Sequence, residues 1–319
     1  MFEKIPQPTA SKDLEKESFG THPEVSRYLE KVDLEKLKGL FKQRIANLGL
    51  DSAGNIGRFV EKKGRFQKAN FLRRILHIGG QYIPSEEKIV VSEEYFEEKV
   101  GKSHEKVKEA FMLSLVCHEE THATGFQEHT NEGGLFQEKS TKKLGYASAT
   151  INRDFLVRIR INTMYDALNE GVTDLIGEET YYDYLGKHPG EGEDLSLYES
   201  PYAEGRLFAE TLIKKVSEEC ELEEGVVWKV VQRGYFAGED LTGERMKRLF
   251  QDIFPDQFKK LVAEYKGDPN ESNVENLWKQ SVWTDEDKKR IRRWMLSVYR
   301  TMPKETSSLD VSAGSAKGY

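Results

Sequence analysis

The sequence lacks the features that mark secreted and membrane-spanning proteins. It holds only two cysteines, Cys117 and Cys220, in 319 residues, so a framework of several disulfides is excluded. It has no run approaching the ~18 apolar residues of a membrane span, and its first twenty residues lack the apolar core of a secretion signal. We therefore expect a cytoplasmic protein with no membrane partner.

An excess of positive charge is also missing. The 55 acidic residues outnumber the 48 lysines and arginines, which gives a net charge of −7. Proteins that bind nucleic acids usually carry a basic surface, so this balance argues against a nucleic-acid partner. Aromatic residues make up 11% of the chain, which favours a packed core over global disorder.

The chain reads as one long domain between two polar tails. Residues 1–20 and 303–319 are polar and are predicted to be flexible, and no repeat or linker divides residues 21–302. Apolar residues recur at helical spacing from about 103 to 124, from about 162 to 180, and in about five segments beyond residue 201. A run rich in β-branched residues within 71–92 predicts strands. The predicted fold class is α+β, mostly α, with a small sheet before residue 100.

The most informative motif is His118-Glu119-Glu120-Thr121-His122, an H-E-x-x-H pattern. Residues four apart share one face of a helix, so both imidazoles can reach a single Zn²⁺ ion. Glu119 lies about 100° further round the helix, where it misses the metal but can reach a water beside it. The spacing therefore predicts zinc ligands at His118 and His122 and a general base at Glu119.

A second motif, residues 169–174 with the sequence NEGVTD, supplies a third ligand. Glu170 and Asp174 lie opposite the apolar stripe of their predicted helix, on a face that also holds small residues. Glu170 is predicted to complete the zinc site, while Asp174 and Asn169 are predicted to hold the ligating histidines through their free N–H groups. Gly171 is unfavourable inside a helix, and close approach of another helix would explain it.

The alternatives to a metal site are a hydrogen-bonded histidine pair for the first motif and a solvated acidic helix face for the second.

Taken together, the motifs HEETH and NEGVTD resemble those of the gluzincin metallopeptidases, the thermolysin-like family. The resemblance covers about residues 90–180. It implies a zincin-like catalytic domain over 21–302, in which 21–150 holds a small edge-stranded sheet and the metal helix and 151–302 is helical. The long interval between the motifs implies an insertion at about 126–160.

The same resemblance implies hydrolysis of a peptide or protein substrate. In gluzincins an edge strand before the metal helix pairs with the extended substrate, and Glu87–Ser92 is predicted to be that strand. A peptidase also needs a donor for the oxyanion that forms on the scissile carbonyl. Tyr202 is the favoured candidate; the others are Arg206, Tyr165, Tyr181 and Tyr235.

Two zinc-based alternatives and one metal-free alternative stay open. The segment 118–129 partly matches the metzincin pattern H-E-x-x-H-x-x-G-x-x-H, with Gly125 in place. Glu128 occupies the position of the third histidine there, and His129 follows one residue late. The remaining alternatives are a zinc-binding protein without peptidase activity and a helical interaction protein without metal. The sequence predicts no particular oligomeric state.

Overall fold

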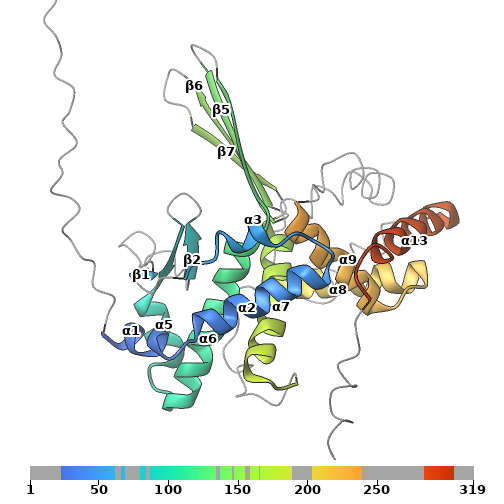
Figure 1. Ribbon diagram of the computed structural model, residues 1–319. Coiled ribbons are helices and arrows are strands. Elements are labelled where there is room, and N and C mark those ends of the chain that lie inside the picture. The colour runs from blue at the N-terminus through green and yellow to red at the C-terminus, as the bar shows by residue number, and fades with distance from the viewer. Residues whose placement is uncertain are drawn as a thin grey trace, which may run out of the picture.

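The computed structural model describes residues 23–61, 66–68, 80–83, 87–133, 137–145, 147–154, 159–164, 166–188, 203–238 and 284–304, which form an α+β fold that is mostly helical (Figure 1). The helices are α1 Pro23–Glu30, α2 Leu34–Asn47, α3 Ala53–Ile56, α5 Glu93–Val100, α6 Glu105–Thr124, α7 Asp166–Leu185, α8 Ala203–Cys220, α9 Glu224–Ala237 and α13 Asp285–Tyr299. The strands are β1 Phe66–Lys68, β2 Gly80–Ile83, β3 Lys88–Val91, β4 Gln127–Gly133, β5 Gln137–Leu144, β6 Ala147–Asp154 and β7 Ile159–Met164. This confirms the coarse fold class, α+β and mostly α. Across these ranges the search for membrane spans found no helix with the length and apolar character to cross a bilayer.

Helices α6 and α7 lie side by side at the centre of the helical body. Helix α6 contacts α1, α3, α5, β2 and α7, and it is apolar on nearly every side where it passes through the core. Helix α7 packs against α2, α8 and α9 as well as α6. Its apolar stripe of Leu168, Val172 and Ile176 is buried, as expected for one face of an amphipathic helix. The face that α7 presents to α6 carries polar side chains, among them Glu170 and Thr173.

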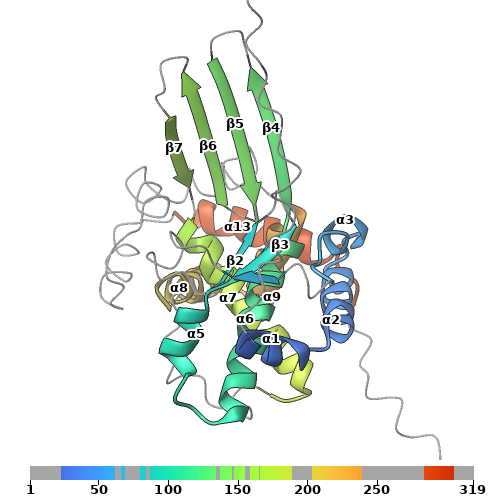
Figure 2. The ribbon, with the colours of Figure 1, turned by 90° about the vertical axis from the view of Figure 1, so that its left-hand side faces the viewer.

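A three-stranded sheet lies beside α6, with the strand order β1-β3-β2. Strands β2 and β3 form an antiparallel hairpin, and β1 pairs with β3 in parallel. The prediction that Glu87–Ser92 forms the edge strand is wrong, because β3 lies in the middle with β1 on its other side. The edge that contacts α6 is β2 (Figure 2).

A second sheet fills the predicted insertion between the two motifs. Strands β4 to β7 form an antiparallel meander in chain order, and the meander extends away from the helical body (Figures 1 and 2). The prediction of a β element only before residue 100 is therefore wrong. The predicted helix start at 162 is also wrong, because residues 159–164 pair with β6 as β7 and the helix begins at Asp166. The meander leaves the end of α6 and returns to the start of α7.

The segment beyond residue 201 is helical where the structure describes it. Helices α8, α9 and α13 are three of the five or so predicted there, and residues 239–283 lie outside the described ranges. The predicted tail 1–20 and most of the tail 303–319 also lie outside them. The domain boundaries at 21, 150 and 302 stay a prediction.

Candidate metal centre

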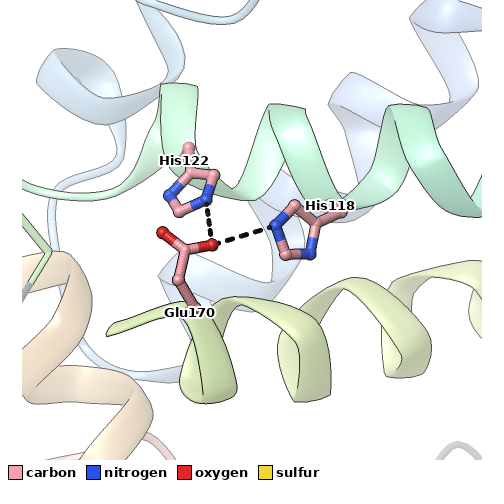
Figure 3. A group of neighbouring side chains, drawn as sticks. All are labelled: His118, His122 and Glu170. Atoms are coloured by element: carbon pink, nitrogen blue, oxygen red, sulfur yellow. Dashed lines mark hydrogen bonds and ion pairs between the residues drawn. The ribbon is translucent and has the colours of Figure 1, made fainter. Parts of the chain in front are cut away.

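Two buried histidines project from one face of α6. His118 and His122 are 4% and 6% exposed, and their ring centroids lie 5.0 Å apart. They share a face because four residues make slightly more than one helical turn. Figure 3 shows both rings directed toward the neighbouring helix α7.

Glu170 reaches both rings from α7. Its Oε2 atom lies 3.2 Å from Nε2 of His122 and 3.4 Å from Nε2 of His118 (Figure 3). One potential ligand atom from each of the three residues lies within 4.8 Å of the other two. The structure thus brings together the three side chains that the two motifs predicted, although His122 and Glu170 are 48 positions apart in the sequence.

Two of the three separations between these atoms suit a tetrahedral zinc ion. Zinc binds nitrogen and oxygen at about 2.0–2.2 Å, so the ligand atoms of a regular tetrahedron lie about 3.3–3.6 Å apart. The separations of 3.2 and 3.4 Å from the Glu170 oxygen are close to that range. Two imidazoles and one carboxylate also form a donor set typical of catalytic zinc, which keeps its fourth position open.

Two glycines allow α7 to pack closely against two neighbouring helices, α6 and α8. A Cβ atom on Gly177 would lie 3.2 Å from the backbone N and Cα of His118, which is tighter than normal contact. A Cβ atom on Gly171 would overlap the backbone carbonyl of Gly205 in α8. The predicted close approach of another helix at Gly171 is confirmed, and α8 is that helix.

The charged groups of the site shift one another's pKa values. Burial lowers the pKa of His118, but the carboxylates of Asp174 and Glu170 outweigh that effect and raise the pKa to about 10. Burial raises the pKa of Glu170, but His122 and His118 outweigh it and hold the pKa well below its usual range. The carboxylate of Glu170 therefore faces a protonated His118, and a metal cation that binds here would replace that proton.

Asp174 lies behind His118, one turn beyond Glu170. Its Oδ1 atom is 3.5 Å from Nδ1 of His118, and its Oδ2 atom is 3.8 Å from a guanidinium nitrogen of Arg206. Its predicted role, to hold the imidazole through its free N–H, stays a prediction. Asn169 is buried, with its side-chain oxygen beside Gly145 at the turn between β5 and β6. Its predicted role beside a histidine stays a prediction.

Glu119 lies on the side of α6 that faces β2. A Cβ atom on Gly80 would be 2.5 Å from Oε1 of Glu119, so the carboxylate lies directly against this strand. Neither carboxylate oxygen makes a hydrogen bond of normal geometry within the described ranges. Burial raises the pKa of Glu119, while the two histidines and the backbone amide of Tyr82 oppose the change. A buried carboxylate with a raised pKa is a stronger proton acceptor than an exposed one.

The neighbouring Glu120 is engaged elsewhere. Its Oε2 atom accepts a hydrogen bond of 3.0 Å from the backbone N–H of Val60, outside the metal-ligand group. Burial raises the pKa of Glu120 well above its usual value, and the nearby charge of Glu119 adds to the effect. The contacts of Glu120 are therefore those of a structural residue. Glu119 is the carboxylate of the motif that is available as a proton acceptor.

The candidate oxyanion donors have different positions. Tyr202 and Tyr165 lie outside the described residues, so their predicted roles stay predictions. Arg206 is 2.7 Å from Glu178 and 2.9 Å from Glu210, in addition to its contact with Asp174. Tyr181 is buried on α7, two turns beyond Asp174.

Tyr235 is fully buried on α9, where its hydroxyl contacts Thr173 at 2.9 Å. Sequence reasoning missed Thr173 as a site residue, although it belongs to the NEGVTD motif and lies on the same helix face as Glu170. The hydroxyl of Thr173 is 3.5 Å from Nδ1 of His122. These contacts place the Tyr235 hydroxyl behind His122, on the side away from Nε2.

The metzincin-like ligands lie at the start of β4. Glu128 is exposed and is not in the metal-ligand group found among the described residues, and the side chain of His129 lies outside them. Comparison of the chain with protein-family models, curated proteins and solved structures gave no match.

Proposed function

We propose that the protein is a zinc metallopeptidase whose metal is bound by His118, His122 and Glu170. The observation that carries the proposal is the convergence of these three side chains from two helices, with the Glu170 oxygen at separations from both histidine nitrogens that suit tetrahedral zinc. The buried carboxylate of Glu119 beside this group supports a catalytic rather than a structural metal. The resemblance of both motifs to those of zincin-like gluzincins supports peptide bonds as the substrate.

In this proposal the chain's own residues move the protons. Zinc, when bound, would polarise the scissile carbonyl and make a bound water more acidic. Glu119 accepts a proton from the attacking water and then donates it to the nitrogen of the leaving amine. Its raised pKa suits both steps, because the group must gain and lose the same proton near neutral pH.

The substrate would lie along β2. This strand is at the edge of its described sheet and contacts the metal helix, so an extended peptide can add to it by backbone hydrogen bonds. Such binding would place the peptide next to Glu119, since Gly80 of β2 touches that carboxylate. Tyr202 remains the proposed donor to the oxyanion.

The proposal is tested by the zinc content of the wild type and of a Glu170→Ala variant. We expect about one zinc ion per wild-type chain after gentle purification, and a small fraction of that in the variant, because two histidines alone bind zinc weakly. Glu128→Ala is the matched control: it removes the exposed carboxylate that the metzincin-like scheme would use. This variant is expected to keep its zinc. Elemental analysis of all three proteins gives the numbers.

Other outcomes would change the assignment. Zinc retained in Glu170→Ala but lost in Glu128→Ala would support the metzincin-like scheme. No zinc in the wild type, even after zinc is added, would overturn the metal centre. Removing the metal with a chelator distinguishes a structural from a catalytic role, because loss of a structural zinc unfolds a protein. We expect the apo-protein to stay folded, with an unchanged far-ultraviolet circular dichroism spectrum.

A further inference from the structure

A line of buried hydroxyl groups extends behind His122. Nδ1 of His122 lies 3.5 Å from Oγ1 of Thr173, which lies 2.9 Å from the hydroxyl oxygen of Tyr235. That hydroxyl is 3.3 Å from the backbone carbonyl of Thr121. The side chains come from α6, α7 and α9, and those of Thr173 and Tyr235 are fully buried. The line starts on the ring edge opposite the nitrogen that faces Glu170.

The donors and acceptors in this line favour one direction of hydrogen bonding. A carbonyl oxygen only accepts, so the Tyr235 hydroxyl can donate to Thr121. The Thr173 hydroxyl then donates to Tyr235, and its oxygen accepts from Nδ1–H of His122. This direction makes three hydrogen bonds, whereas the reverse direction, from Tyr235 to Thr173 to His122, makes two. Buried polar groups favour the fuller set, because each missing bond costs about 1–3 kcal/mol.

We propose that Thr173 and Tyr235 are positioning residues that hold His122 with its proton on Nδ1 and with Nε2 directed at the metal. The inference rests on the proposed metal centre and deepens it. A ligating imidazole needs a bare nitrogen toward the metal, and the bond made by its other nitrogen fixes which one that is. Asp174 occupies that place behind His118, and the Thr173–Tyr235 pair occupies it behind His122.

The ring of Tyr235 is confined, so its hydroxyl has little freedom to move. A Cβ atom on Gly125 would lie 2.9 Å from the ring, and one on Gly145 would overlap it. The backbone N–H of Phe126 also donates to the carbonyl of Tyr235 at 3.2 Å. The end of α6 and the turn between β5 and β6 thus fix a side chain of α9 at the metal site. Larger residues at either glycine would displace the hydroxyl.

The test compares zinc affinity, by competition with a chromophoric chelator, in wild type, Thr173→Val, Tyr235→Phe and Thr173→Ser. Valine keeps the shape of threonine without its hydroxyl, and we expect zinc to bind about 10–100-fold more weakly. Tyr235→Phe acts through Thr173, so a smaller loss in the same direction is expected. Thr173→Ser restores the hydroxyl and should restore most of the affinity.

Thr180→Val is the matched control. Thr180 is equally buried on the same helix, but its hydroxyl bonds to the carbonyl of Ile176 at 2.7 Å and not to a histidine. We expect this variant to bind zinc like the wild type. A general effect of removing a buried hydroxyl from α7 would weaken both valine variants alike, and it would overturn the positioning role.

A second readout is the Nδ1–H proton of His122 in the zinc-loaded protein, observed by nuclear magnetic resonance. In the wild type we expect a downfield signal that exchanges slowly with solvent, and its loss or upfield shift in Thr173→Val. An unchanged signal and unchanged zinc affinity in Thr173→Val would contradict the inference while the metal centre stands. A wild type that binds no zinc would overturn both.

Discussion

A Glu119→Gln variant is expected to bind zinc as tightly as the wild type and to hydrolyse peptides about 10²–10⁴ times more slowly. Glutamine preserves the size of the side chain but does not take a proton from the attacking water. The metal ligands are untouched, because Glu119 is not in the group formed by His118, His122 and Glu170. The measurements are zinc content and the initial rate of cleavage of denatured casein and of a mixed library of internally quenched peptides.

Glu120→Gln is the control for this experiment. Glu120 is the adjacent residue on α6 and is also fully buried, and burial raises its pKa well above the usual value. A glutamine there keeps the size of the side chain, and its carbonyl oxygen can still accept a hydrogen bond from the backbone N–H of Val60. We expect near wild-type hydrolysis. Equal losses in both variants would show that a buried carboxylate is needed for folding, and full activity in Glu119→Gln would contradict the mechanism.

The grouping of His118, His122 and Glu170 was predictable because it depends on local periodicity. The spacing of His118 and His122, and the position of Glu170 opposite the apolar stripe of its helix, follow from 3.6 residues per turn. The helical spacing of the apolar residues predicted which faces of the two helices are polar. The glycine at position 171 indicated that another helix packs closely there. Each of these inferences needs only one segment of sequence at a time.

The parts that were missed depend on contacts between distant segments. Strand order in the first sheet depends on the pairing of β1 with β3, which no pattern within Glu87–Ser92 reveals. Strands β4 and β5 consist almost entirely of polar residues, so they lack the apolar alternation that signals a strand. The contact between Thr173 and Tyr235 joins residues 62 apart, and only the packing of α7 near α9 brings it about.

Replacement of Gly171 by alanine is expected to destabilise the fold by about 3 kcal/mol or more. In an exposed helix the same change would stabilise by up to ~1 kcal/mol. Here the added Cβ would overlap the carbonyl of Gly205, a backbone atom that no side-chain rotation can move aside. Helix α8 would have to shift away from α7, which would loosen the packing of buried residues such as Phe208. Glu170 is the adjacent residue, so zinc affinity should fall as well.

The stability change is measured as the midpoint of urea unfolding with a chelator present, which separates it from any loss of zinc. Gly39→Ala is the matched control, because Gly39 lies exposed inside α2 and a Cβ atom there would meet nothing within 4 Å. We expect this control to raise the urea midpoint, which corresponds to a gain of about 0.5–1 kcal/mol in the free energy of unfolding. The two substitutions are chemically identical and differ only in what the new methyl group meets. A Gly171→Ala variant as stable as the wild type would therefore show that α7 and α8 pack less closely than the structure has them.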